Sequence, residues 1–558
     1  MPQYLRTALA TATAAVLTGG LLAVAPAATA DSGTPLAGAD FNGDGYADVA
    51  VSASRATVEG QAAAGEIAIV YGGPEENRHT TIHQGSPGVP GDPEPYDYFG
   101  AAHAWGDFDG DGYDDLITGA PGEDIGSDHN TGTAVILWGS PSGLVGGTTL
   151  KDPRPGSHDG FGAPVVTGDF DGDGRTDIAV GAAYGYASVD IFLGGVTRDG
   201  TPGSHHVVTP PLHGRFGLGA RSLGAGDLDG DGKDDLLVDG YAADDARPAT
   251  FWLPGTAEGP TTTGTQRLPG GPIGAVGDTD GDGYDEVILG TDPTEAADGP
   301  PPAPGHDELN LGTDPPAAAD GPRELAPPKD PRTAKPREDT PEAKAREAAE
   351  KVKNSKAEAA AKAPRSTAVG QPARPSELGG SVRIVHGTAK GPAHGLVRTL
   401  TPDTVDVPGN VEKGDAFGAD LALGDLDGDG HPDLLVGVPG EHIDGVPETG
   451  AVIALYGDSD GSGLTGDGAR SLHQNTRAFR DENEPGDRFG TAVHLADLDG
   501  DGLPDPVIGS AGENAGNGAV HTARSTESRK LTDGTVLFVS TLGISTEGTP
   551  ELGTHISG

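Results

Sequence analysis

The chain has 558 residues, enough for several ordinary domains or for one large repeat architecture. Lys and Arg number 36 against 85 Asp and Glu, and the resulting formal net charge of -49 argues against nucleic acid as a partner and suits a protein that binds cations. Glycine (93) and proline (47) are abundant and cysteine is absent, which indicates a turn-rich fold whose loops are held by something other than disulfides.

Residues 1–30 have the pattern of a secretory signal peptide. Arg6 precedes an apolar stretch from Ala8 to Val24, and Ala28-Thr29-Ala30 is a small-residue cleavage site. The alternative is a membrane anchor, which fits less well because glycines interrupt the apolar run. We expect a secreted, extracellular protein with no membrane span in the rest of the chain.

A nine-residue acidic loop occurs seven times after this segment. In the copy DFDGDGRTD, which begins at Asp169, carboxylates occupy positions one, three, five and nine, and glycine occupies position six. The seven copies begin at Asp40, Asp107, Asp169, Asp227, Asp278, Asp425 and Asp497. They start 51 to 72 residues apart, except for one interval of 147 residues, and this regularity is typical of a propeller, solenoid or array.

Each loop presents the oxygen ligands that Ca²⁺ prefers. Six to eight oxygens suit Ca²⁺, whereas Mg²⁺ takes fewer protein ligands and more water. Position seven is chemically varied, so we expect it to act through its backbone carbonyl. The predicted ligands of up to seven Ca²⁺ ions are, loop by loop, Asp40, Asn42, Asp44, Tyr46, Asp48; Asp107, Asp109, Asp111, Tyr113, Asp115; Asp169, Asp171, Asp173, Arg175, Asp177; Asp227, Asp229, Asp231, Lys233, Asp235; Asp278, Asp280, Asp282, Tyr284, Glu286; Asp425, Asp427, Asp429, His431, Asp433; and Asp497, Asp499, Asp501, Leu503, Asp505.

Two alternatives compete with this interpretation. An EF-hand carries a bidentate Glu at position twelve and lies between helices, whereas here position nine is acidic and a short apolar run such as VAV or IAV follows at once. Such a run predicts a buried strand, so each loop joins strand to strand. The second alternative is a set of metal-free Asx-rich turns. If the loops do bind Ca²⁺, the carboxylates of each loop should repel one another when Ca²⁺ is removed, and the loop should loosen.

The flanks of the loops are also repeated. A Phe-Gly pair precedes most of them, a Gly-Ala-Pro-like turn such as Gly119-Ala120-Pro121 follows several, and a strand ending in glycine completes the unit. The Phe-Gly pairs are Phe99-Gly100, Phe161-Gly162, Phe216-Gly217, Phe417-Gly418 and Phe489-Gly490. Together these motifs resemble the FG-GAP repeat of integrin alpha-chain N-terminal domains and of bacterial extracellular proteins. The resemblance implies an all-β, seven-bladed β-propeller with calcium-binding β-hairpin loops, and phenylalanines packed between neighbouring blades.

Several repeats depart from this pattern. The fourth has Asp239-Gly240-Tyr241 where the Gly-Ala-Pro turn belongs, and the fifth lacks Phe-Gly, so irregular blades four and five are expected. The first also lacks Phe-Gly, but ELGTHISG (551–558) resembles the start of RFGTAVHLADLDG (488–500). We therefore predict that residues 552–558 pair with the strand after Asp48 and close the ring, the alternative being a frayed tail.

The long interval indicates an insertion in blade five, over residues 292–378, between propeller segments 31–291 and 379–558. It contains a Pro- and Ala-rich duplication, which predicts a flexible loop, and a helix over residues 340–363 that Thr340 caps. Of the 36 Lys and Arg, 13 lie between Arg323 and Arg374. The segment is either a solvated helix or a basic arm that contacts an anionic wall polymer or the propeller itself.

The sequence favours an extracellular binding or adhesion scaffold for protein or glycan, and it leaves a secreted hydrolase and a purely structural protein as alternatives. It has no His-Glu-x-x-His motif and no cysteine nucleophile, and no catalytic residue or organic cofactor site is predicted. Glu123, Glu441 and Glu513 recur at matching positions, which favours one shared structural bond over catalysis. His103, His205 and His206 are expected to be loop or packing residues. A grouping of Trp105, Trp138, Trp252 and Tyr96 on one face would indicate a binding surface.

Overall fold

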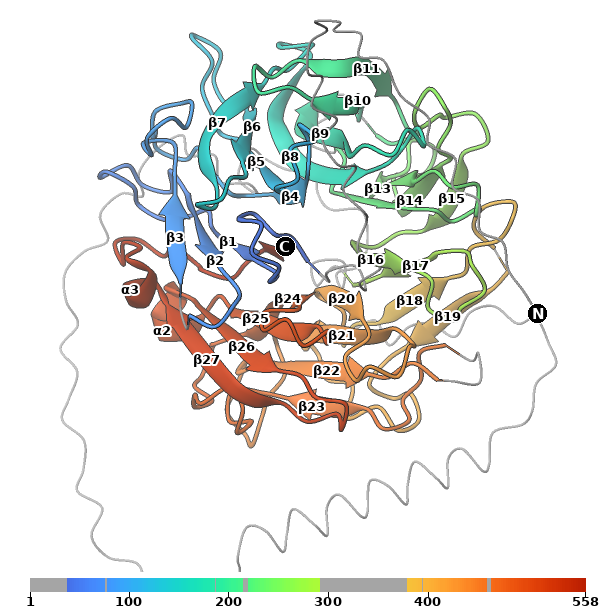
Figure 1. The fold of residues 1–558 in the computed structure, drawn as a ribbon. Helices are drawn as coiled ribbons and strands as arrows, with labels where there is room; N and C mark the ends of the chain where they lie inside the picture. Colours follow the sequence, from blue (N-terminus) through green and yellow to red (C-terminus); the bar gives the residue numbers. More distant parts are fainter. Residues whose placement is uncertain are drawn as a thin grey trace, which may run out of the picture. The chain divides into compact units, whose positions relative to one another are not determined.

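The fold is taken from a computed structural model, which describes residues 38–75, 78–185, 187–213, 219–291, 379–393, 395–458 and 463–558. Regular structure in these ranges is almost entirely β and forms seven four-stranded antiparallel sheets. The sheets follow one another around a ring in chain order (Figure 1). The prediction of a seven-bladed β-propeller is confirmed.

The predicted signal peptide (1–30) and the insertion (292–378) with its helix lie outside the described residues. So does the Phe216-Gly217 pair. Among the described helices, none is long and apolar enough to cross a membrane.

Each blade has four strands, and their bounds follow in order along the sheet. Blade one contains β28 (Ile556–Ser557), β1 (Val49–Ala53), β2 (Glu66–Val70) and β3 (His79–Ile82). Blade two contains β4 (His103–Gly106), β5 (Asp115–Ala120), β6 (Thr133–Trp138) and β7 (Val145–Leu150). Blade three contains β8 (His158–Gly168), β9 (Asp177–Gly185), β10 (Val189–Val196) and β11 (Pro202–Val208). Blade four contains β12 (Ser222–Gly226), β13 (Asp235–Tyr241), β14 (Pro248–Leu253) and β15 (Gln266–Pro269).

The other three blades have the same order. Blade five contains β16 (Ile273–Gly277), β17 (Glu286–Leu289), β18 (Val382–Val385) and β19 (Val397–Leu400). Blade six contains β20 (Leu421–Gly424), β21 (Asp433–Val438), β22 (Ala451–Leu455) and β23 (Arg470–Leu472). Blade seven contains β24 (Phe489–Ala496), β25 (Asp505–Ser510), β26 (Ala519–Arg524) and β27 (Thr532–Phe538). Two short helical segments, α2 (Glu513–Gly516) and α3 (Val539–Leu542), belong to the seventh repeat.

The burial of the strands explains the short apolar runs of the sequence. Every residue of the second strands β1, β5, β13 and β21 is buried, as is every residue of the third strands β2, β6 and β22. Because each blade packs face to face against two neighbours, these strands need apolar side chains on both faces. The outer strands β3, β7 and β23 are largely half-buried or exposed.

The hydrophobic core is divided among the seven blade boundaries, with one cluster of buried residues at each. The phenylalanines of the Phe-Gly pairs take part in these clusters. Phe161, for example, is fully buried together with Ile136 of blade two and Val180 of blade three. Packing of these phenylalanines between neighbouring blades is confirmed for Phe99, Phe161, Phe417 and Phe489.

The glycines of the repeat allow the backbones of neighbouring blades to touch. A Cβ atom on Gly119 of blade two would lie 1.8 Å from the carbonyl oxygen of Gly162 in blade three. Gly437 and Gly509 have the same relation to Gly490 and Gly553, at 2.3 and 2.0 Å. The first glycine of the Gly-Ala-Pro-like turn therefore packs on the glycine of the next blade's Phe-Gly pair, or on its counterpart.

The ring closes as predicted. Strand β28 pairs with β1, with Ile556 opposite Val51 and Ser557 opposite Ala50. The amide of Gly553 also donates to the carbonyl of Ser52 at 3.0 Å. In Figure 1 blades one and seven accordingly lie side by side, and the C-terminus lies at the inner side of blade one.

Blades four and five are complete despite their unusual sequences. Each forms a four-stranded sheet, and β12 pairs with β13 without a register shift. In blade five the pairing of β16 with β17 shifts register between Ile273 and Ala275, but β8 and β24 shift in the same way beside their Phe-Gly pairs. The two blades therefore differ from the others in the side chains of their motifs, while their strand order is the same.

Candidate metal centres

Six of the acidic loops connect the first and second strands of their blades, as the resemblance implied, whereas the first follows the bridge residue Ala39 and leads into β1, whose inner partner is β28. Position one organises the turn of the loop. In loop one, Asp40 Oδ1 accepts the amides of Gly43 and Asp44 at 2.7 and 3.1 Å, and Oδ2 accepts the amide of Gly45 at 2.9 Å. Position six has a φ of +80° to +90° in all seven loops, a conformation that favours glycine. The sharp turn predicted at this position is confirmed.

The carboxylates at positions one, three and nine converge. In loops two, three and four, one ligand atom from each of these positions lies within 4.8 Å of the others, and the sets are Asp107, Asp109, Asp115; Asp169, Asp171, Asp177; and Asp227, Asp229, Asp235. Position five also supports the turn, since Asp173 Oδ1 accepts the amide of Arg175 at 2.9 Å. Five oxygen donors around a short turn fit a hard divalent cation, and the carboxylates and the position-seven carbonyl would hold Ca²⁺.

Position nine is the buried member of the set. Burial raises the pKa of Asp48 to about 8, and it raises the pKa of Asp115 and Asp433 to about 7, with nearby loop carboxylates adding to the effect. Backbone amides oppose the shift: Asp115 Oδ1 accepts from Gly139 at 2.7 Å. A buried anion beside two further anions is costly unless a cation compensates it, so this donor set matches a bound metal ion.

Basic side chains contact several of these loops. The guanidinium of Arg198 bridges Asp109 and Asp111, with Nη2 2.6 Å from Asp111. Arg529 bridges Asp427 and Asp429 of loop six in the same way. Positions three and five thus flank one positive charge in both loops, which shows that each loop attracts a cation to this place.

Position eight contributes a contact that the sequence did not reveal. Asp114 Oδ2 accepts the amide of Asp40 at 2.8 Å, and the amide of Asp114 donates to the carbonyl of Asp40 at 3.1 Å. Asp234 and Asp285 make the same pair of bonds with the loops of the preceding blades. The only signal in the sequence is a second acid in DGYDD, DGKDD and DGYDE. These hydrogen bonds therefore join loops two, four and five directly to the loop of the preceding blade.

Two of the three recurring glutamates make the shared structural bond that was expected of all three. Gln84 Nε2 donates to Glu123 Oε2 at 2.5 Å, and Gln474 Nε2 donates to Glu513 Oε2 at 2.7 Å. Glu441 differs, because Pro402 stands at the position of those glutamines. Burial, Asp415 and Glu412 raise the pKa of Glu441 to about 7.

The histidines also have structural contacts. His103 is buried against the His555 ring, and its Nδ1 lies 2.6 Å from Ser557 Oγ at the ring closure. His205 Nε2 pairs with Asp190 at 2.9 Å, and His206 Nε2 donates to the carbonyl of Pro260 at 3.3 Å. His205 and His206 line an open groove of about 890 Å³ between the outer parts of blades three and four.

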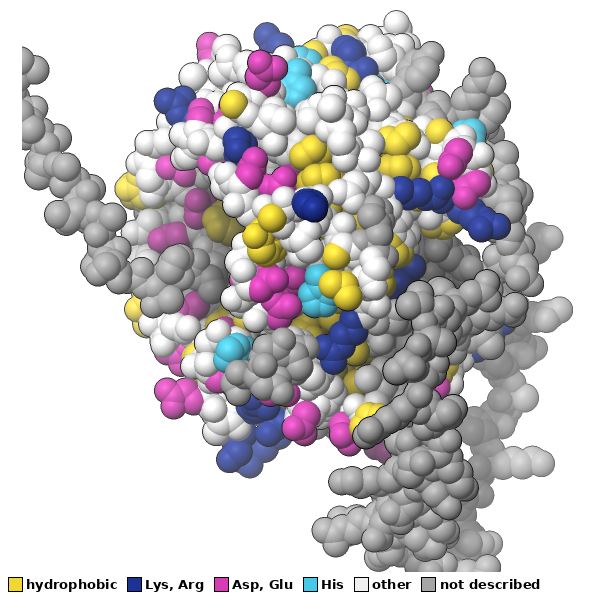
Figure 2. Space-filling view, turned by 90° about the vertical axis from the view of Figure 1, so that its right-hand side faces the viewer, with side chains coloured by type: hydrophobic (Ala, Val, Ile, Leu, Met, Phe, Trp, Pro, Cys, Tyr) yellow, Lys and Arg dark blue, Asp and Glu magenta, His cyan; other side chains and the backbone are white. Residues whose placement is uncertain are grey.

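Among the described residues the aromatic side chains do not form an exposed binding face, and Trp105 and Tyr96 are half-buried. Trp138 and Trp252 are only 5% and 4% exposed, and the large hydrophobic side chains that are exposed in the described ranges are all aliphatic. On the side of the molecule seen in Figure 2, acidic and basic side chains alternate with small hydrophobic areas. Any ligand is thus expected to be met by polar and charged side chains.

Comparisons with known proteins agree with this repeat structure. A model of the FG-GAP repeat matches residues 32–70, 99–137, 417–455 and 489–522, and an FG-GAP-like repeat matches residues 169–238. Integrin alpha pat-2 of Caenorhabditis elegans is 30% identical over 228 residues, which are 35% of this chain and 18% of that protein. Human integrin alpha-IIb is 35% identical over 164 residues, 26% of this chain and 15% of that protein.

Two further proteins are similar to parts of the chain. Phosphatidylinositol-glycan-specific phospholipase D of Rattus norvegicus is 31% identical over 125 residues, 22% of this chain and 14% of that protein. The chain thus spans less than a fifth of the length of these curated relatives. The BP39L lectin of Burkholderia pseudomallei has 12% identity and a TM-score of 0.34, covering 89% of this chain and 98% of the lectin, a score too low to support an inference.

Proposed function

The chain is an FG-GAP repeat β-propeller similar to integrin alpha chains, and from this we propose that it is a secreted, calcium-binding scaffold that recognises an extracellular protein or glycan. One observation carries the proposal: seven acidic loops occupy the same place in seven blades, directly before the second strand. Because the blades share one strand order and follow one another around the ring, we expect all seven loops to lie on one face. That face would hold up to seven Ca²⁺ ions.

Calcium would take the role that disulfides play in many secreted proteins. The chain has no cysteine, and loops two, three and four each keep three converging carboxylates next to one another. A bound Ca²⁺ would tie the first strand of a blade to the second and, through position eight, to the neighbouring loop. The opposite face and the loops around the ring would remain free for a ligand.

Integrin alpha relatives support a role in recognition more than in catalysis. The Gln84–Glu123 and Gln474–Glu513 bonds also favour this, because both glutamates are engaged by glutamine amides in the same way. A hydrolase and a purely structural protein remain the competing candidates. Contact with an anionic wall polymer through the basic residues between 323 and 374 is a further part of the proposal.

The test is to incubate the mature protein, with Ca²⁺ and with chelator, on an array of glycans and matrix proteins, and to examine the retained molecules by mass spectrometry. Retention of intact molecules that is lost with chelator is the expected result. Shortened molecules would instead identify a hydrolase. No retention, together with a large gain in protease resistance on adding Ca²⁺, would indicate a structural protein.

A further inference from the structure

Loop five differs from the other six in the residues that should hold its ion. Position nine is Glu286, whereas the other loops have aspartate there, and position two is Thr279 in place of Phe or Leu. Both the amide and the hydroxyl of Thr279 donate to Glu286 Oε2, each at 2.7 Å. Two donors on one oxygen fix the glutamate and leave Oε1 directed into the loop.

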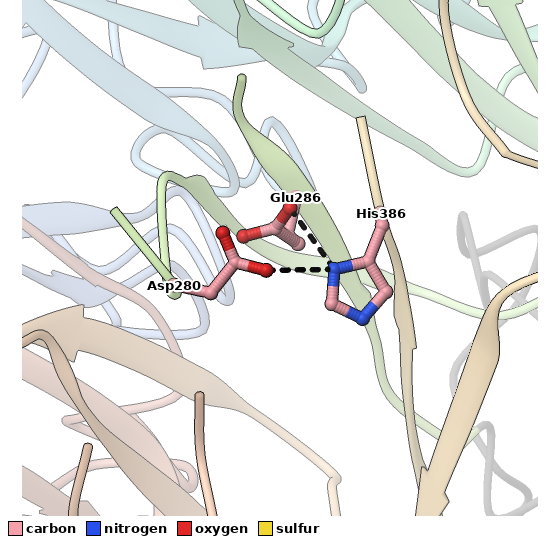
Figure 3. A group of neighbouring side chains, drawn as sticks. All are labelled: Asp280, Glu286 and His386. Carbon is pink, nitrogen blue, oxygen red and sulfur yellow. Dashed lines mark ion pairs between the residues drawn. The ribbon is translucent and has the colours of Figure 1, made fainter. Parts of the chain in front are cut away.

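A histidine at the end of the third strand of the blade completes this cluster. His386 follows β18, and its Nδ1 lies 3.4 Å from Asp280 Oδ2 and 3.3 Å from Glu286 Oε1 (Figure 3). The corresponding residues of blades one, two and six are Tyr71, Trp138 and Tyr456. Histidine occupies this position only in blade five.

The cluster contains buried oxygens that lack hydrogen-bond partners. Glu286 is fully buried, and its Oε1 has no aligned hydrogen bond. Asp280 Oδ1 is buried and is also without a hydrogen-bond partner. By contrast, the position-nine aspartates use both oxygens, as Asp235 does with the amides of Leu228 and Gly255. Of the two oxygens, Glu286 Oε1 also faces the imidazole nitrogen of His386, and an unsatisfied buried carboxylate oxygen in this position indicates a place for a cation.

We propose that loop five binds a transition-metal ion of the Zn²⁺ or Co²⁺ class through Asp280, Glu286 and Nδ1 of His386. An imidazole together with carboxylates suits these ions, whereas Ca²⁺ takes oxygen ligands. The separations fit as well, because ligands about 2.0–2.2 Å from a tetrahedral ion lie about 3.3–3.5 Å apart. This proposal rests on the proposed function, which makes the loop a cation site, and it adds a second class of metal ion.

The test is a titration of the chelator-treated full chain with Co²⁺, followed by its visible d–d absorption, and then displacement by Zn²⁺. His386→Phe should weaken Co²⁺ binding at this site at least tenfold and remove its absorption band. The matched control is His129→Phe, since the His129 side chain is exposed and pairs with Asp124, which belongs to none of the acidic loops. The control should leave the band unchanged.

A second variant distinguishes loss of the metal site from misfolding of the blade. Glu286→Asp gives loop five the position-nine residue of its six counterparts, so the blade should fold, but the shorter side chain withdraws from His386. It should lose the Co²⁺ band and keep Ca²⁺ binding. An unchanged band in both His386→Phe and Glu286→Asp would overturn the proposal. His386 would then be only an ion-pair partner of Asp280 and Glu286. Ca²⁺ stoichiometry measured on the same samples separates this failure from failure of the proposed function, which would show no bound Ca²⁺ at all.

Discussion

In two of the acidic loops one arginine bridges the carboxylates at positions three and five, and a bound Ca²⁺ would compete with it for them. Arg198 bridges Asp109 and Asp111, and Arg529 bridges Asp427 and Asp429. An ion entering these loops must displace a guanidinium whose side chain is partly exposed, at 47% and 31%. Ion pairs of this kind contribute about 0.5–1 kcal/mol, so they reduce the affinity for Ca²⁺ without abolishing binding.

Replacing both arginines, as Arg198→Gln and Arg529→Gln, should therefore strengthen Ca²⁺ binding at two of the seven loops by about two- to fivefold. Competition with a fluorescent calcium chelator measures the change. Arg55→Gln is the matched control, because Arg55 pairs with Glu551 and not with a loop. Weaker binding in the double variant would mean that the arginines support the bound state.

The glycine contact between blades is expected to be intolerant of any side chain. In Gly119→Ala the new methyl group would meet the backbone oxygen of Gly162 at 1.8 Å, and neither backbone can move without disturbing a buried strand. We expect a loss of about 3 kcal/mol or more in unfolding free energy, seen as a lower denaturation midpoint. Gly395→Ala, where a Cβ would meet nothing within 4 Å, should leave the midpoint unchanged. Equal midpoints for the two variants would contradict the packing described.

At the scale of single residues, the sequence predicted the loops better than their surroundings. The spacing of carboxylates and glycine identified the turn at position six and the acids at positions one, three and nine. It did not identify Asp114, Asp234 and Asp285, whose partners lie in the preceding blade. Nor did it identify His386, which is separated from Glu286 by the inserted segment and approaches it only because β17 and β18 pair.

At the scale of strands, a group of buried histidines holds the ring closure. His103 lies against His555 and Ser557, and His494 Nε2 donates to the carbonyl of Gly558 at 2.8 Å. Burial lowers the pKa of His103 and His555 and lowers that of His494 to about 4. The folded state therefore keeps all three neutral, while the unfolded segment takes up protons near pH 6.5.

Acid should consequently release β28 before the rest of the ring. Histidines with a depressed pKa contribute stability that is present above about pH 6.5 and is lost as the pH falls toward 4. Hydrogen–deuterium exchange, corrected for intrinsic rates, should show that peptides with β28 and β1 lose protection between pH 7.5 and 5.5. Peptides with β13 of blade four serve as the reference. Uniform loss of protection across both blades would argue against a local effect.

Strand order was largely predictable because each apolar run follows an acidic loop and needs both faces covered. The pairing of β28 with β1 was predictable for the same reason: ELGTHISG supplies the Leu-Gly counterpart of a Phe-Gly pair that the first repeat lacks. What the sequence overstated was the irregularity of blades four and five. Their backbone pairing depends on strand hydrogen bonds, which tolerate the replacement of Phe-Gly and Gly-Ala-Pro side chains.

At the scale of the whole molecule, bound calcium would act mainly on the formal net charge of the chain. Seven Ca²⁺ ions would reduce the formal net charge from -49 to -35 and neutralise it where the carboxylates are closest. Chelator should therefore lower the thermal midpoint of the mature protein, and Ca²⁺ should restore it better than Mg²⁺. High NaCl should lessen but not remove the difference, since salt screens the general repulsion only. An identical midpoint with and without chelator would remove the stabilising role of the loops.

The long insertion should be dispensable for folding. The described residues on its two sides meet, because Thr291 Oγ1 accepts the amide of Ser381 and donates to the carbonyl of Ser381, both at 2.7 Å. Replacing residues 292–378 with a short glycine linker should leave the thermal midpoint unchanged. Retention on an anionic polysaccharide column should fall in the same variant if the basic arm binds such polymers. A large loss of stability would show that the segment packs against the propeller.

The pairing of β28 with β1 also sets the order of events during synthesis. Strands β1, β2 and β3 are made first, yet their sheet lacks its innermost strand until residues 556 and 557 have been added. Blades two to seven each contain strands that are consecutive in the chain and can assemble as they emerge. Joining the two distant ends requires closure of a very long loop, which is slow. The earliest blade to be translated is therefore the last to be completed, and it exposes an unpaired strand edge throughout that wait.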